Sequence, residues 1–236
     1  MTKIYYKTFF FIVIVFFSSC AELQQVVNEL PNGTLTNADI ASGLRQALDK
    51  GIDEQVKKLT LEDGFYKNDL VKIGLPNELK KVDKALRDIG LSKLADEGVK
   101  ILNRAAEDAV SEATPIFVDA VKGITFTDTK NILLGEDNAA TEFLKSGTSD
   151  ALYNKFEPVI KTSFDKVGAD KIWSDLINKY NTIPFVKKVN PDLTNYVTQE
   201  ALNGVYTMIA VEEKEIRTKI SSRTTAILQK VFALQD

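Results

Sequence analysis

Residues 36–59 read TNADIASGLRQALDKGIDEQVKKL. Apolar side chains recur in this stretch every three or four residues, which is the spacing of one face of an α-helix. They are Ile40, Leu44, Leu48, Ile52, Val56 and Leu59. Thr36 or Asn37 stands just before the pattern and can cap the N-terminus of a helix. The stretch therefore predicts a long amphipathic helix with one buried face.

The same spacing continues through most of the chain. It predicts helices over about residues 77–90, 92–115, 116–121, 127–134, 137–146, 149–167, 169–181, 192–218 and 223–234. Gly135, Gly147 and Gly168 stand at predicted helix ends, as expected of C′ glycines, and Pro115 is expected to kink or end its helix. Strand signals are limited to residues 124–127 and 186–189. The fold class is therefore all-α, with one domain of about eight to ten helices over residues 36–236.

A break follows the first predicted helix. Glu62, Asp63 and Gly64 interrupt the apolar spacing, and the segment from Phe65 to Pro76 is too apolar for an exposed linker. We expect this segment to be an ordered loop that packs against the helices.

The N-terminus has the features of an export signal. Lys3 and Lys7 precede the apolar run of residues 9–17, which is too short to cross a bilayer, and two serines separate this run from Cys20. Cys20 is the single cysteine of the chain, so lipid attachment to its thiol is the best explanation for its position. We expect a signal peptide over residues 1–19, lipidation at Cys20 and a tether over residues 20–35. The membrane is then a partner through this lipid.

The predicted location is the bacterial cell envelope. Ala21 follows the cysteine, so the aspartate that retains many lipoproteins at the inner membrane is absent. We expect a lipid-anchored protein of the outer membrane that faces the periplasm. A flexible tether of this length would hold the domain roughly 20 Å from its anchor.

The composition excludes several kinds of chemistry. The chain has no histidine, so a Ser-His-Asp triad and an imidazole-ligated zinc site are impossible, and we expect no cofactor and no metal site. Ser163 and Lys166 match an S-x-x-K pattern, which we interpret as solvated helix surface because no K-T-G follows. The net charge of −3 falls to −5 without residues 1–19, which argues against nucleic acid as a partner.

Charged residues at one-turn spacing are the main candidates for a site. Arg104 and Glu107 are three apart, and Glu213 and Arg217 are four apart, so each pair can meet along a helix surface. Either pair could be a surface ion pair or a partly buried network that lines a cleft. Aromatic residues of the C-terminal half could add a ligand pocket, although at helical spacing they are more often core. The full candidate set is Arg104, Glu107, Tyr180, Asn181, Tyr196, Glu212, Glu213 and Arg217; no catalytic residue is assigned.

Short segments along the whole chain carry a family resemblance. Among them are Glu62-Asp63-Gly64-Phe65-Tyr66, Asn103-Arg104-Ala105-Ala106-Glu107, Tyr180-Asn181, Pro191-Asp192-Leu193 and Arg223-Thr224-Thr225. With these segments the chain resembles bacterial envelope lipoproteins that contain the domain of unknown function 4197. The resemblance implies one contiguous domain and brings no activity or catalytic residue with it.

Two classes of function follow. The first is a non-catalytic module that binds an envelope protein, a lipid or another apolar ligand. The alternative is a carboxylate-dependent hydrolase or lyase of cell-wall glycan, with Glu107 or Glu62 as its single acid. The chain lacks the Glu-Ser pair of lytic transglycosylases, so we favour the binding module.

Overall fold

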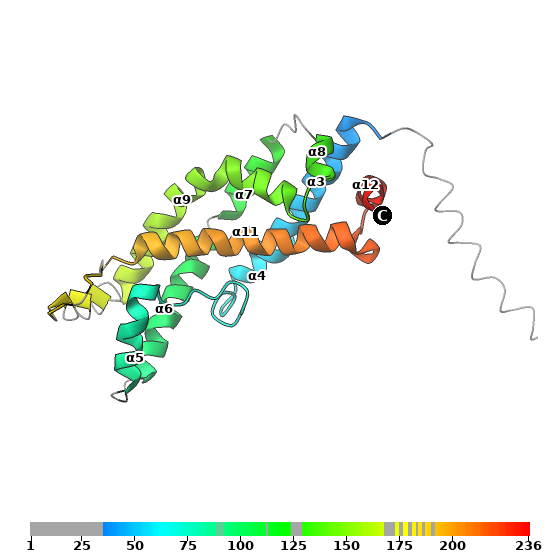
Figure 1. Cartoon of the computed structure of the whole chain (residues 1–236). Coiled ribbons are helices and arrows are strands. Elements are labelled where there is room, and N and C mark those ends of the chain that lie inside the picture. The colour runs from blue at the N-terminus through cyan, green and yellow to red at the C-terminus, as the bar shows by residue number, and fades with distance from the viewer. Residues whose placement is uncertain are drawn as a thin grey trace, which may run out of the picture. The chain divides into compact units, whose positions relative to one another are not determined.

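The fold is built from α-helices (Figure 1). The computed structural model describes residues 35–236 except 89, 91, 112, 124–128, 168–172, 175–176, 179–180, 183, 186 and 190–191. The predicted signal peptide, Cys20, most of the tether and Tyr180 lie outside the described residues. Within the described part there is no strand, which confirms the all-α class, and residues Asn37–Asp236 form one compact unit. No helix in this part is both long and apolar enough to cross a membrane.

The helices occur in a simple order along the chain. Their bounds are α3 (Asn37–Gly51), a π-helical turn (Ile52–Val56), α4 (Lys57–Leu59), α5 (Lys80–Asp88), α6 (Ser92–Ser111), α7 (Ala113–Gly123), α8 (Thr129–Leu133), α9 (Ala139–Val167), α11 (Thr194–Thr218) and α12 (Ala226–Phe232). The predicted helix over 169–181 and the extended stretch over 124–127 fall mostly or wholly outside the described residues. Residues 187–189 have no regular secondary structure.

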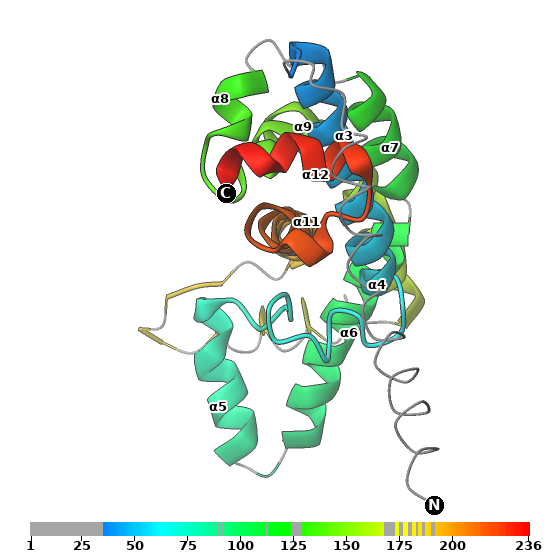
Figure 2. The same cartoon turned by 90° about the vertical axis from the view of Figure 1, so that its right-hand side faces the viewer.

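Helix α11 lies at the centre of the bundle. Seen along its axis in Figure 2, it is surrounded by α3, α9, α12 and the loop that follows α4. It packs against α9, α3 and α6, and apolar residues along its whole length are buried, among them Val197, Val205, Ile209 and Ile216. Because α11 is covered on several sides, polar residues of this helix are also drawn into the interior.

The first helix keeps its apolar face turned inward by changing its pitch. Ile40, Leu44, Leu48, Ile52 and Val56 are spaced by four residues, so in a regular α-helix the row would drift by about 40° at each step. A π-helical turn over Ile52–Val56 holds an extra residue per turn and offsets this drift. All five side chains and Leu59 are buried, so the apolar row stays inward through the π-helical turn. The amphipathic helix was predicted, but its π-helical turn was not.

Helix α9 corrects a predicted boundary. We predicted separate helices over 137–146 and 149–167 with Gly147 between them, but one helix runs through both Gly147 and Pro158. A Cβ at Gly147 would meet nothing within 4 Å, and α9 packs against α6 and α11. The helix is held by this packing, which outweighs the weak propensity of one exposed glycine. Pro115 fits its prediction better, since α6 ends at Ser111 and Pro115 lies in the first turn of α7.

The loop between α4 and α5 is ordered and packed, as predicted. Phe65, Val71, Ile73 and Leu75 of this loop are buried. Its tight entry requires Gly64, because a Cβ there would overlap the main-chain carbonyls of residues 58 and 59.

Gly204 makes room for the same loop on α11. An added Cβ at Gly204 would lie 2.7 Å from the ring of Phe65. The loop therefore packs directly against the central helix α11. This packing depends on two glycines, Gly64 in the loop and Gly204 in α11.

Candidate functional site

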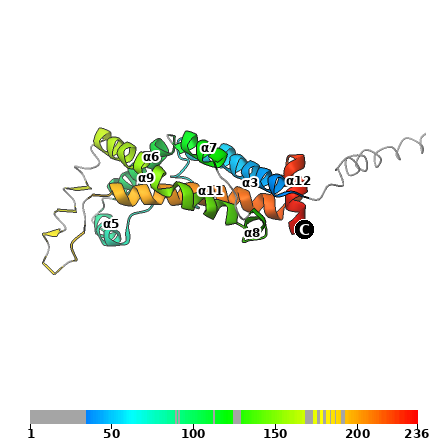
Figure 3. The same cartoon turned by 90° about the horizontal axis from the view of Figure 1, so that it is seen from above.

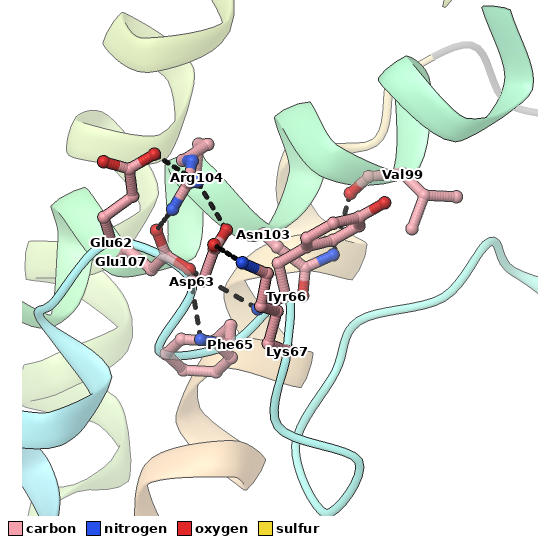
Figure 4. A network of polar contacts seen from close by, with 9 residues as sticks. All are labelled: Glu62, Asp63, Phe65, Tyr66, Lys67, Val99, Asn103, Arg104 and Glu107. Atoms are coloured by element: carbon pink, nitrogen blue, oxygen red, sulfur yellow. Dashed lines mark hydrogen bonds and ion pairs between the residues drawn. The ribbon is translucent and has the colours of Figure 1, made fainter. Parts of the chain in front are cut away.

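A polar network fastens the loop to α6 (Figure 4). The buried carboxylate of Glu107 accepts hydrogen bonds from the main-chain N–H groups of Phe65, at 3.1 Å, and Tyr66, at 3.4 Å. Its second oxygen is paired with Arg104 at 2.5 Å. Both oxygens of Glu107 are thus occupied, and the side chain satisfies donors of a segment about forty positions away in sequence.

Arg104 joins three carboxylates. Besides Glu107 it contacts Glu62 at 2.9 Å and Asp63 at 2.5 Å. Although partial burial opposes the charged form, the bonds to Glu107 and Asp63 raise the pKa of Arg104 above its usual value. Asp63 has a backbone φ of 69°, which is uncommon outside glycine. Its pKa is lowered by a hydrogen bond from Lys67 and by the charge of Arg104.

Asn103 of α6 also holds the loop by hydrogen bonds, and this contact was not predicted from the sequence. Its side-chain amide bonds both the N–H and the C=O of Ile73, each at 2.8 Å, and also the C=O of Val99 at 2.7 Å. The amide therefore acts toward the extended loop as a neighbouring strand would. The only sequence signal was its place beside Arg104 in a segment of family resemblance.

Glu213 and Arg217 of α11 form a fully buried pair. Their side chains are 1% and 2% exposed, and their charged groups are 2.7 Å apart. Glu213 accepts the main-chain N–H groups of Ala140 and Thr141, at 2.9 and 2.7 Å, in the first turn of α9. Arg217 donates to the carbonyls of residues 132 and 133 at the end of α8. The acid and the base thus cap the two helix ends whose partial charges they complement.

Glu212 holds a different pair of elements together. Lys50 of α3 donates to it at 2.6 Å, and Gln55 of the π-helical turn donates at 2.8 Å. Burial raises the pKa of Glu212, but the hydrogen bonds from Lys50 and Gln55 outweigh it, so the pKa is below its usual value. The π-helical turn therefore carries Gln55 toward α11.

Tyr196 lies in a groove that we name the α5–α11 groove. It has a volume of about 760 Å³ and is open to solvent. Its apolar lining is Leu75, Pro76, Val99 and Tyr196, and its charged lining is Lys80, Asp83, Arg87 and Glu200. Within the described part of the chain, neither Lys80 nor Glu200 makes an ion pair or a side-chain hydrogen bond. The hydroxyl of Tyr196 donates to the carbonyl of Gly74 at 3.0 Å.

The predicted candidate residues do not gather at one place. Asn181 bonds the N–H and C=O of Val189, each at 2.8 Å, and so closes its own loop. Tyr196 and Glu212 are on the same helix but about 24 Å apart along its axis. Three smaller grooves, of about 470, 430 and 330 Å³, lie beside α9. None of the four grooves described here is lined by Glu107, Glu212, Glu213 or Arg217.

The S-x-x-K pattern is solvated helix surface at Lys166 but not at Ser163, which corrects half of its interpretation. Ser163 is buried and donates to Asp108 of α6 at 2.8 Å, so it joins α9 to α6. The hydroxyl faces a carboxylate, and it lines one of the smaller grooves together with Lys166. Among the described residues, no group of three or more carboxylates, cysteines or histidines could hold a metal ion.

Comparison with known proteins places the chain in a family. No curated protein and no solved structure matches the chain. The network residues Glu62, Asp63, Arg104 and Glu107 and the capping pair of α11 all lie within the part that a family model covers. The family of proteins of unknown function DUF4197 has a model that matches residues 34–233, which is most of the chain, so the protein belongs to this family.

Proposed function

We propose that this protein is a lipid-anchored component of the bacterial cell envelope that binds a partner and catalyses no reaction. The observation that carries the binding role is the α5–α11 groove, where an apolar floor lies beside two charges, Lys80 and Glu200, that have no partner among the described residues. Unpaired charges next to exposed apolar surface are typical of sites that exchange water for a ligand. The occupant is an envelope protein, a lipid or another apolar ligand, and no nucleic acid.

The alternative, a glycan hydrolase or lyase, has weaker support. Such an enzyme needs a carboxylic acid that can be protonated and that reaches the scissile bond. Glu107 has both oxygens occupied by N–H donors and Arg104, and the pKa of Glu212 is lowered, which favours the ionised form. Glu62 is exposed, but it pairs with Arg104 and lines none of the four grooves.

The anchor is supported by sequence alone. The apolar run before Cys20, the two serines at the junction and the absence of another cysteine support lipidation of this residue. We expect radiolabelled palmitate to be incorporated into the wild-type protein and not into Cys20→Ser. The variant should also leave the membrane fraction, because one lost attachment point removes several acyl chains.

Photocrosslinking in living cells tests the binding role. A photoreactive amino acid replaces Lys80 or Glu200 in the groove, and Lys122 or Asp150 as matched exposed controls on α7 and α9. We expect one adduct of defined mass from both groove positions and none from the controls. An adduct pattern that is the same at all four positions would contradict a binding role for the groove.

A digestion assay tests the alternative. Purified protein is incubated with peptidoglycan sacculi, and released fragments are measured. We expect none. Release that is lost in Glu62→Gln or Glu107→Gln, while the variant stays folded, would replace the binding module by the hydrolase or lyase.

A further inference from the structure

Three exposed aliphatic side chains stand at one end of the bundle. Leu134 follows α8, Ile220 follows α11 and Leu234 follows α12, and each residue is more than half exposed. Single exposed leucines are ordinary in soluble proteins. Three such side chains at the ends of three different helices can share one surface only if these helix ends lie close together.

Hydrogen bonds bring the three helix ends together. Gln235 donates to the carbonyl of residue 133 at 2.6 Å, which joins the end of α8 to the segment after α12. Arg223 donates to the carbonyl of Ile216 at 2.9 Å and makes two bonds of 2.7 Å to Asp236. These bonds join the end of α11 to the same segment. Figure 3 shows α8 and α12 at the same end of α11, with α5 at the other.

The chain also enters the domain at this end. Asp39, in the first turn of α3, pairs with Lys230 of α12 at 3.6 Å, and Gly43 packs against Val231. The covalent path from Cys20 therefore reaches the domain at Asn37, beside α12. Fifteen residues lie between Cys20 and Thr36, so a short segment joins the proposed anchor to this end of the domain.

Several charged residues near the three aliphatic residues are paired with opposite charges, whereas the exposed Lys130 and Glu136, on either side of Leu134 in sequence, form no ion pair with a described residue. Lys214 pairs with Asp137 at 3.2 Å, Lys219 with Glu215 at 2.5 Å, and Arg223 with Asp236 at 2.7 Å. Paired charges cost less to bring to an interface of low dielectric constant than isolated ones. This end therefore offers apolar contact with little opposing net charge.

We propose that the surface formed by Leu134, Ile220 and Leu234 rests on the lipid bilayer to which Cys20 anchors the protein. This inference rests on the lipidation in the proposed function and adds an orientation to it. Helix α11 is about 37 Å long, and Tyr196 stands in its first turn. The α5–α11 groove is consequently held away from the membrane and open to soluble or wall-bound partners.

Site-directed fluorescence can test the orientation. Single cysteines replace Leu134, Ile220 or Leu234 in the full chain, where lipid already blocks Cys20, and each receives an environment-sensitive fluorophore. Matched controls are Leu61→Cys and Leu70→Cys, which are equally exposed on the loop after α4, and Phe185→Cys, which precedes the other end of α11. The lipidated proteins are reconstituted in vesicles of phosphatidylethanolamine and phosphatidylglycerol that contain a headgroup-depth quencher.

We expect quenching at 134, 220 and 234 to be about threefold stronger than at 61, 70 and 185, because contact with a bilayer places side chains within about 5–10 Å of the headgroup boundary. The Cys20→Ser versions of the same proteins should show no quenching by the vesicles at any of the six positions. Equal quenching at all positions in protein that floats with the vesicles would overturn the orientation while leaving the anchor intact. Protection of 134, 220 and 234 in the lipid-free variant would instead indicate contact between protein copies and would also overturn it. Wild-type protein that does not float would overturn the anchor and this inference together.

Discussion

The two Arg–Glu pairs look alike in sequence and differ in the structure. Arg104 and Glu107 lie on α6, and Glu213 and Arg217 lie on α11, each pair separated by one helical turn. The side chain of Arg104 is 28% exposed and contacts two further carboxylates, whereas that of Arg217 is 2% exposed and donates to main-chain carbonyls. The spacing of charges along one helix therefore does not reveal their burial, which is decided by elements distant in sequence.

The carboxylates of Glu107 and Glu213 nevertheless make the same kind of contact. Glu107 accepts N–H groups from the loop after α4, and Glu213 accepts N–H groups from the first turn of α9. In both places a carboxylate satisfies main-chain donors that a helix or loop leaves open, and an arginine neutralises the buried charge. The difference in exposure predicts that the α11 pair contributes more to stability than the α6 pair.

The largest effect is expected at the buried pair. Removing one partner by Glu213→Ala or Arg217→Ala should lower the free energy of unfolding by about 3–5 kcal/mol, because an uncompensated charge or orphaned donors stay buried. Chemical denaturation of the folded variants measures this loss. Lys219→Ala, which removes one partner of an exposed pair at the end of the same helix, should cost about 1 kcal/mol or less.

A double variant sharpens the same result. Replacing both Glu213 and Arg217 by leucine removes the charges but leaves the N–H groups of Ala140 and Thr141 without an acceptor. We expect the double variant to remain destabilised, unlike a simple buried ion pair, which apolar residues often replace without loss. Recovery of wild-type stability would show that capping by Glu213 contributes little.

A somewhat smaller loss is expected at Asn103. Its amide satisfies both main-chain groups of Ile73, and Asn103→Ala leaves them buried without a partner. We expect a loss of about 2–3 kcal/mol, since each unsatisfied buried group costs about 1–3 kcal/mol and water can reach part of this loop. Hydrogen exchange should show faster exchange of the residues 65–75 than of α11. A loss spread evenly over both regions would contradict a role in fastening the loop.

The α6 pair should be less sensitive, and its two members should differ. Arg104→Ala removes partly solvent-screened ion pairs and should cost about 1 kcal/mol. Glu107→Ala also leaves the buried N–H of Phe65 without its acceptor and should cost about 2 kcal/mol. Equal losses of about 3–5 kcal/mol for both variants would mean that this pair is as strongly buried as the one on α11. Wild-type stability combined with loss of a partner would assign the pair to a binding site.

The contrast also shows how much the sequence could predict. Periodic apolar residues predicted the helices and the buried face of the first one, because helix periodicity is a local property that packing reinforces. The uninterrupted α9 was missed, since Gly147 is a local stop signal that packing against α6 and α11 overrides. The acceptors Glu107 and Glu213 were recognised as charged candidates, but their partners were not. Those partners are main-chain groups 41 and 72 residues or more away, and no short-range pattern encodes them.

The smallest effect is expected at Glu212, next to the buried pair on α11, and it depends on pH. The pKa of Glu212 in the folded protein lies below the ordinary glutamate value of 4.5, because hydrogen bonds from Lys50 and Gln55 outweigh the effect of burial. At a pH between the folded and unfolded pKa values the unfolded chain binds more protons, so stability rises with pH in that range. The contribution of Glu212 is therefore complete above about pH 5.5 and is lost as the pH falls through 4.5 toward the folded value. Because Glu212→Gln keeps one oxygen that can accept the hydrogen bonds from Lys50 and Gln55, the difference should be about 1 kcal/mol or less. Unfolding free energies of the wild type and Glu212→Gln, measured from pH 7 to pH 3, should differ at neutral pH and converge on acidification.

The lowered pKa values of Asp63 and Asp236 act in the same direction in both proteins, so they cancel in this difference. A gap that stays constant or widens toward pH 3 would show that Glu212 stabilises the contact between α3 and α11 by its packing and not by its charge.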